Sequence, residues 1–247
     1  MLIDIKEKVQ NSVVTAFHNA VSETLKSNNG LRIKTLHVSD FVSPCLRKSY
    51  YNSIIKDVTL DAQKNKVLFF GVILHEHTKL SHFHEVTMCY DLINDKAMTP
   101  QEVSLSKDQT GIITGTLDDL MRIGDDFVIV DKKTWNAKGW VKTEPDESYY
   151  RQLSIYRVLL FEAYGIDAKY GCLLYLDKGN DLNETPLAFD LAPIGETKKF
   201  LRDTFTELQT GIPKATITYL CNGKNKAGRI YCPYLEQCKK DGRPEVT

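Results

Sequence analysis

The sequence predicts one domain of mixed α/β (α+β) class, in which helices flank a mixed central β-sheet and cysteine-bearing segments lie at both ends. The 247 residues are enough to bury one substantial core. Short β-rich runs lie between segments with helical periodicity. No internal repeat, low-complexity tract or long linker divides the chain. We therefore expect helix, strands, helix, strand and helix, in that order, within a single unit.

Helical periodicity begins near the N-terminus, where apolar residues recur from Ile5 to Leu25 before a stop signal at 28–30. Ser39 and Asp40 can cap a further helical turn. Including that turn, four more helices are expected, at 39–52, 67–77, 147–164 and 196–210. The second of these is apolar for eight residues before it meets His75, so we expect a buried helix that emerges at this histidine.

Strand-like runs begin at about residue 84. The expected strands are 84–92, 102–106, 112–123, 126–134 and 169–177. Gly124 and Asp125 give a hairpin signal between the third and fourth strands. Trp135 and Trp140 mark the loop that follows this hairpin.

The charge balance limits what the chain can bind through its overall field. The 32 basic and 32 acidic residues give a net charge of zero, so any contact with nucleic acid must rest on local patches. The first ten residues include acidic side chains and lack an apolar core, which argues against a signal peptide. No apolar run is long enough to cross a bilayer. We expect a soluble, cytoplasmic protein with no membrane partner.

The hairpin at 112–134 carries the most informative residues. Because side chains alternate along a strand, Asp131 and Lys133 point to one face and Lys132 to the other. Asp118 and Asp119 also point to opposite faces, so one of them can converge with Asp131 on a shared metal ion. Carboxylates hold Mg²⁺ or Mn²⁺, which polarises a phosphoryl oxygen and lowers the pKa of an attacking water. Without other motifs, a surface hairpin with solvated charges would be the better explanation of this pattern.

Four short motifs occur in one order, and they are Gly71–His75, Gly115–Asp118, Asp131–Lys133 and Gln152–Tyr156. In type, order and separation they resemble the RecB-like branch of the PD-(D/E)XK nuclease superfamily. The resemblance implies a restriction-endonuclease-like core and a Mg²⁺- or Mn²⁺-dependent deoxyribonuclease. It also divides the chain into a helical N-terminal part (1–60), the nuclease core (61–190) and a C-terminal helix with a basic tail (191–247).

The resemblance assigns a role to each matching residue. It implies that His75, Asp118, Asp131 and the backbone carbonyl of Lys132 ligate the metal, that Lys133 is the catalytic lysine, and that Gln152 and Tyr156 contact the DNA strand.

The family spacing selects Asp118 over Asp119. The alternation of the strand agrees, because Asp119 shares its side with apolar residues such as Leu117. Glu102 is a further candidate, since it matches an acidic position at the start of an upstream strand.

Four of the six cysteines form a second group, with Cys45 before the proposed core and Cys221, Cys232 and Cys238 after it. In a reducing compartment this grouping predicts metal or cluster ligation. The layout resembles the iron–sulfur members of the RecB-like nucleases, notably the CRISPR-associated exonucleases of the fourth Cas family. It implies a four-iron four-sulfur cluster, with structural zinc as the alternative.

This chain departs from many of those relatives in one respect, because ten residues separate Cys221 from Cys232. The remaining two cysteines, Cys89 and Cys172, fall in apolar strands, where a small buried side chain is expected.

The segment from Lys214 onward contains seven basic and three acidic residues, and this local excess of positive charge predicts a phosphate-binding tail. Trp135, Trp140, Tyr149 and Tyr150 are candidates to stack on bases. These features favour an exonuclease acting on single-stranded DNA or DNA ends, with or without endonuclease activity.

Its expected role is DNA trimming for CRISPR spacer acquisition, alongside the integration proteins, in antiviral defence. The alternatives are a stand-alone viral or plasmid nuclease, acting in the host cytoplasm if viral, and a catalytically silent DNA-binding module. Cleavage polarity and oligomeric state are left open.

Overall fold

The computed structural model describes residues 35–55, 73, 78–135, 142–179, 183–216, 221 and 232–242. The helix expected at 5–25, most of the one expected at 67–77, and both His75 and Trp140 lie outside these ranges. In the described part of the chain, no helix is long and apolar enough to cross a membrane.

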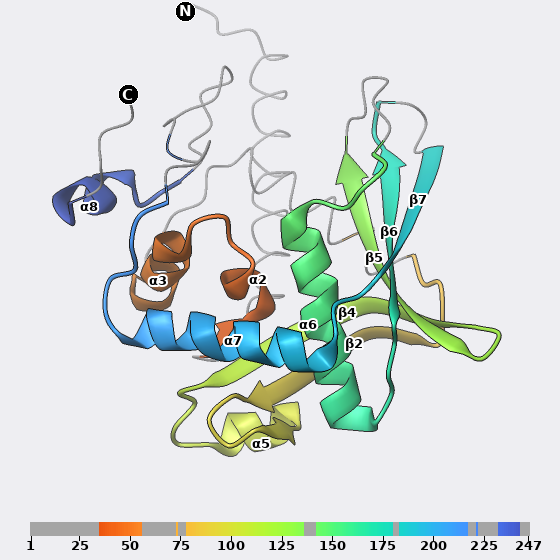
Figure 1. Ribbon diagram of the computed structural model, residues 1–247, viewed down its shortest axis with the longest axis horizontal. Coiled ribbons are helices and arrows are strands. Elements are labelled where there is room, and N and C mark those ends of the chain that lie inside the picture. The colour runs from red at the N-terminus through yellow and green to blue at the C-terminus, as the bar shows by residue number, and fades with distance from the viewer. Residues whose placement is uncertain are drawn as a thin grey trace, which may run out of the picture.

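The described strands form one mixed sheet in the order β3-β2-β4-β5-β6-β7, with β1 paired to β4 (Figure 1). The β1–β4 and β5–β6 pairs are parallel, and the other pairs are antiparallel. The strands are β1 (Leu36–His37), β2 (Phe83–Asp91), β3 (Lys96–Met98), β4 (Ile112–Ile123), β5 (Asp126–Trp135), β6 (Tyr170–Asp177) and β7 (Asn183–Asp190).

Helix α6 packs on the sheet, and α7 crosses α6 (Figure 1). The described helices are α2 (Val38–Phe41), α3 (Leu46–Ile54), α5 (Pro100–Leu105), α6 (Glu147–Tyr164), α7 (Ile194–Gln209) and α8 (Leu235–Lys240). The main core lies between the sheet and α2, α6 and α7, and it includes Leu117, Ile129, Leu159 and Leu201. A separate small cluster around Tyr51 and Tyr234 joins α3 to the chain around α8.

The predicted fold class is confirmed, and most expected elements are observed near their expected bounds. Strands β2, β4, β5 and β6 and helices α6 and α7 match, and the turn between β4 and β5 has Gly124 at φ 64°, as a tight hairpin requires. The single helix expected at 39–52 is instead two helices, α2 and α3. Helix α2 is capped by His37, and Asp40 accepts the His37 N–H at 3.0 Å from within the first turn.

The strand expected at 102–106 is wrong, because these residues belong mainly to α5. Thr99 accepts the N–H of Glu102, and the Glu102 carboxylate accepts the N–H of Thr99 at 2.6 Å, while Pro100 occupies the first turn. This capping box starts a helix before strand pairing can begin. Strand β7 was not expected. Pro186 lies inside it, and as an edge strand β7 tolerates a residue that lacks an N–H.

Candidate metal centre and cysteine cavity

The β4–β5 hairpin opens into a fork where the candidate carboxylates lie. Strand β2 pairs along one edge of β4 from Ile112 to Leu120. On the other edge, β1 pairs at Ile113 and Thr114, and β5 pairs only from Asp119 to the hairpin turn. Beyond Val130, β5 continues along β6. The fork, residues 118–119 of β4 and 130–133 of β5, is therefore the point at which the two strands part.

Asp118 and Asp131 lie together at this fork. The N–H of Lys132, which directly follows Asp131, donates to the Asp118 carboxylate at 2.7 Å. Lys133 forms an ion pair with Asp131 at 2.7 Å between Nζ and Oδ2. Asp118 is 8% exposed and Asp131 is 2% exposed. Two carboxylates are thus brought together beside one ammonium. Carboxylate oxygens are the ligands that Mg²⁺ and Mn²⁺ prefer.

The charge state of Lys133 follows from its neighbours. Burial alone would lower the pKa of Lys133, but Asp131 and, more weakly, Asp118 and Tyr149 outweigh it and raise that pKa above the ordinary value. Lys133 also lies 5.0 Å from the centre of the Tyr149 ring. The side chain is therefore a fixed ammonium in this arrangement, suited to stabilising negative charge.

Gly115 explains how α6 reaches the fork. A Cβ at this position would lie 2.6 Å from Val38, 2.8 Å from Tyr156 and 3.2 Å from Leu159. Only glycine allows so close an approach of helix to strand. Tyr156 in turn accepts a hydrogen bond from Gln152 Nε2 at 3.0 Å, so the two residues share one helix face, as their spacing predicts.

The pKa of Tyr156 is raised by burial and by nearby carboxylates. Burial raises that pKa, and repulsion from Asp131, Asp118 and Glu85 raises it further, while the hydrogen bond from Gln152 lowers it. Tyr156 is 3% exposed and Gln152 is half-buried, so Gln152 is the one with surface to offer a substrate. Their contact with DNA stays a prediction.

Glu85 is an acidic neighbour of the centre that the motifs did not include. Its φ of 51° is unusual for a non-glycine residue inside a strand. That conformation leaves no mark in the sequence.

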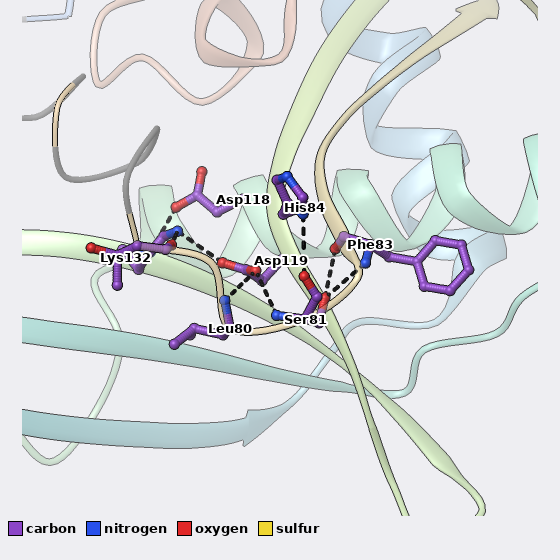
Figure 2. A network of polar contacts seen from close by, with 8 residues as sticks. Leu80, Ser81, Phe83, His84, Asp118, Asp119 and Lys132 are labelled. Carbon is purple, nitrogen blue, oxygen red and sulfur yellow. Dashed lines mark hydrogen bonds and ion pairs between the residues drawn. The ribbon is translucent and has the colours of Figure 1, made fainter.

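The second acidic residue of β4, Asp119, is engaged elsewhere. Its Oδ2 lies 2.8 Å from Nζ of Lys132, and both side chains are completely buried. Asp119 also accepts the N–H groups of Leu80 at 2.9 Å and Ser81 at 3.2 Å, as Figure 2 shows. Lys132 was expected to contribute only its backbone carbonyl, and sequence reasoning gave its side chain no partner.

Two other candidates can be placed. Glu102 lies on α5, not at the start of a strand, and its carboxylate caps that helix through Thr99. The strand on which its assignment rested does not exist, so we withdraw Glu102. His75, the third expected ligand, lies outside the described residues. Within the described ranges, no three His, Cys, Asp or Glu side chains are placed to hold one metal ion.

The four grouped cysteines line one cavity between α3 and the C-terminal segment. Cys45 is the N-cap of α3, and Cys238 lies in α8. Cys45, Cys232 and Cys238 are buried, and Cys221 is partly exposed. Burial raises the pKa of Cys232, and the neighbouring thiols of Cys45 and Cys221 add to the rise.

Polar contacts join the segments that line this cavity. Arg47 donates from Nε to the carbonyl of Pro213 at 2.7 Å and from Nη1 to the carbonyl of Asp241 at 3.2 Å. Its Nη1 also lies 3.8 Å from Sγ of Cys238. Tyr51 donates to the Asp241 carboxylate at 2.5 Å. These contacts and the four cysteines form what we call the clasp, which joins α3 to the C-terminal segment.

The other two cysteines are apart from this group. Cys89 is buried in a small apolar cluster with Val103 and Ile112, and burial raises its pKa to about 11. Cys172 lies within β6, and burial raises its pKa as well.

No family model and no curated protein sequence matches the chain. Among solved structures, it is similar to SSO0001, with a TM-score of 0.59 and 19% identity over 92% of this chain and 97% of that one. At 12% identity it is similar to an alkaline exonuclease (LHK-Exo) from Laribacter hongkongensis, with a TM-score of 0.41 over 73% of this chain and 91% of that one. A proposed exonuclease from Eubacterium rectale gives 12% identity and a TM-score of 0.42 over 87% and 90%. The first similarity shows a shared fold, and the other two scores are too low to assign a fold or an activity.

Proposed function

We propose that this protein is a Mg²⁺- or Mn²⁺-dependent deoxyribonuclease that degrades single-stranded DNA or DNA ends. The observation that carries the proposal is the fork, where Asp118 and Asp131 converge and Lys133 pairs with Asp131 at 2.7 Å. Buried carboxylates beside a fixed ammonium are poorly explained as a solvated surface hairpin. They suit the cleavage of a phosphodiester, in which negative charge must be neutralised.

Each residue of the fork has a part in the proposed reaction. Asp118, Asp131 and His75 would hold the ion, with the Lys132 carbonyl as a further ligand. When bound, the ion would polarise the phosphoryl oxygen and lower the pKa of the attacking water. Lys133 stabilises the charge that develops on the phosphoryl group, because its ammonium is held beside Asp131.

Aromatic side chains near the fork would bind the unpaired strand. Tyr149 lies beside Lys133, and Trp135 packs against Tyr175 with ring centres 5.0 Å apart. Tyr149, Tyr150 and Trp135 are all half-buried, so each keeps some surface for a base. In the C-terminal tail, Lys214, Lys239 and Lys240 are exposed and can contact phosphates.

We also propose that the clasp holds a four-iron four-sulfur cluster through Cys45, Cys221, Cys232 and Cys238. The support is the type of residue, because four cysteines line one cavity. Their side chains would have to close around the cluster, since no three of them are placed around one metal position in the described part of the chain. Thiolates also bind zinc, so zinc is the competing occupant. Held there, the cluster would fasten α3 to the C-terminal segment and take no part in cleavage.

The nuclease proposal is tested with purified protein and single-stranded DNA labelled at either end. We expect degradation with Mn²⁺ or Mg²⁺ and none with EDTA, and the order of products gives the polarity. Binding of the DNA without cleavage in either metal would contradict the proposal and favour the catalytically silent module.

The clasp is tested separately by an absorption spectrum with iron, sulfide and zinc assays on anaerobically purified protein. We expect a coloured protein with about four irons and four sulfides per chain. A colourless preparation with zinc would replace the cluster while leaving the nuclease proposal untouched.

We infer a place in CRISPR spacer acquisition from the combination of this centre with the four cysteines. DNA ends trimmed by the protein would then be passed to integration proteins. A gene for an integrase beside the gene for this chain is the expected observation. Viral or plasmid replication genes in that place would favour the stand-alone role.

A further inference from the structure

A second charge pair lies directly behind the proposed metal centre. Asp119 and Lys132 each follow one of the candidate carboxylates, Asp118 and Asp131, along the chain. Because side chains alternate, the pair occupies the opposite face of the fork. The two charged groups lie 2.8 Å apart, and both side chains are 0% exposed.

This pair also holds a segment of backbone against the sheet. Asp119 accepts the N–H groups of Leu80 and Ser81 (Figure 2). Lys132 donates to the carbonyl of Thr78. The acid thus uses one oxygen for the lysine and the other for the backbone. The pair and segment 78–81 form a single hydrogen-bonded unit, which we call the rear brace.

The rear brace stands where the backbone pairing of the hairpin ends. The β4–β5 ladder stops at Asp119 and Val130, and beyond it β5 pairs with β6. At this point the Asp119–Lys132 ion pair and the bond from the Lys132 N–H to Asp118 join the two strands. The last backbone pair of the ladder and these two side-chain contacts therefore lie directly beside Asp118 and Asp131.

A buried ion pair is weak evidence for stability, because desolvation offsets the attraction, and two apolar residues often serve the fold equally well. Its contribution here is better sought in geometry, since a lysine and a carboxylate fix distance and direction.

We propose that Asp119 and Lys132 are positioning residues, which set the spacing of the Asp118 and Asp131 carboxylates for the metal ion. The inference rests on the proposed function, because it gives these carboxylates their role. Neither Asp119 nor the Lys132 side chain touches the ion or the DNA in this scheme.

The test compares wild type with Asp119→Asn, Lys132→Met and the double variant Asp119→Leu with Lys132→Met. The single variants leave one buried charge without its partner, so they should lower the melting temperature. The double variant should recover part of that loss, because it leaves no unpaired charge, but the N–H groups of Leu80 and Ser81 still lose their acceptor. Asp167→Asn is the control, because it removes the partly buried ion-pair partner of Arg157 in α6, away from the fork.

The deciding readout is the Mn²⁺ dependence of DNA cleavage. In the double variant we expect the Mn²⁺ concentration that gives half-maximal activity to rise about 10-fold or more. This is the usual size of effect when a residue that orients a metal ligand is removed. Asp167→Asn should keep the wild-type Mn²⁺ dependence. A double variant with wild-type melting temperature and wild-type Mn²⁺ dependence would overturn the inference.

Mn²⁺ binding measured by calorimetry separates this inference from the proposed function. If wild type fails to cleave DNA, the proposed function fails, and binding alone then decides the inference. Weaker Mn²⁺ binding in the double variant supports the positioning role. Equal binding in wild type and the double variant rejects it.

Discussion

The fork and the clasp both concentrate reactive side chains, but they are assembled in different ways. The fork draws Asp118, Asp131 and Lys133 from one hairpin, where sheet hydrogen bonds and the rear brace hold the backbone. The clasp draws Cys45 and Cys238 from opposite ends of the chain, on two short helices joined by a few side-chain contacts. The first is shaped by regular structure, and the second is held by side-chain contacts and a small apolar cluster.

This difference predicts two kinds of failure. Replacing Asp131, on the metal-facing side of the fork, should remove catalysis and leave the fold largely intact, because the β4–β5 pairing does not depend on this carboxylate. Asp119 and Lys132, on the opposite face, differ in this respect because both are fully buried. A change at the clasp should loosen the fold and leave the chemistry of each folded molecule intact. Four substitutions test this separation, beginning with the largest expected effect.

Asp131→Asn should reduce cleavage by about 1,000-fold or more, since it removes a charged metal ligand and the ion-pair partner of Lys133. The melting temperature should fall less than in Asp119→Asn, because the amide is nearly the same size and Lys133 is partly exposed, whereas Lys132 is fully buried. Rates with Mn²⁺ and thermal unfolding are the measurements. Asp126→Asn is the control, because Asp126 is exposed on the same strand. Substantial activity in Asp131→Asn would show that the centre lies elsewhere.

Cys232→Ser should cause the second largest effect, and its effect should be on stability. Loss of a bound group that ties distant segments costs about 2–5 kcal/mol, by analogy with native cross-links. We expect loss of iron and a lower melting temperature, with kcat per folded molecule unchanged. Cys172→Ser, in the middle of β6, should keep its iron. A fall in kcat that matches Asp131→Asn would mean that fork and clasp act as one unit.

The sequence predicts the fork better than the clasp, for a physical reason. Alternation along β4 and β5 places Asp131 with Lys133, and this is observed. The hairpin was found because a glycine turn and two β-rich runs are local signals. The clasp contacts of Arg47 and Tyr51 join residues that lie 166 to 194 positions apart, and no local pattern encodes them.

The strand expected at 102–106 is wrong because two local signals compete in this segment. The alternation of Val103 and Leu105 is typical of a strand. Thr99 and Glu102 form a capping box, however, and this cap starts helix α5. The rear brace was missed because a buried lysine is rare and pairing across strands depends on register. Register is a tertiary property, fixed by the whole sheet.

Gly115→Ala should have the third largest effect, and it should lower both the stability of the fold and the rate of DNA cleavage. A methyl group would meet Val38 and Tyr156 within 3 Å, so α6 must move outward, at about 1–3 kcal/mol. We expect a lower free energy of unfolding and reduced kcat, because Tyr156 and Gln152 are displaced from the fork. Gly195→Ala is the control, since no atom lies within 4 Å of its Cβ position. Unchanged stability would mean that α6 tolerates the extra methyl group.

Tyr51→Phe should have the smallest effect, because it removes one hydrogen bond from the clasp. We expect a fall in melting temperature of about 2–4 °C at neutral pH. Tyr164→Phe, with its side chain exposed, is the control.

The pH dependence of the Tyr51→Phe effect identifies its partner. The hydrogen bond from Tyr51 lowers the pKa of Asp241, so this contribution is present above the ordinary aspartate pKa of about 4 and is lost as pH falls through the lowered value. Burial and the same hydrogen bond raise the pKa of Tyr51, so the contribution is also lost as pH rises past the ordinary tyrosine pKa of about 10 and through the raised value. The difference between wild type and Tyr51→Phe should therefore be greatest between about pH 4 and pH 10. A difference that is constant below pH 4 would show that the Tyr51 hydroxyl contributes to the clasp without its bond to the Asp241 carboxylate.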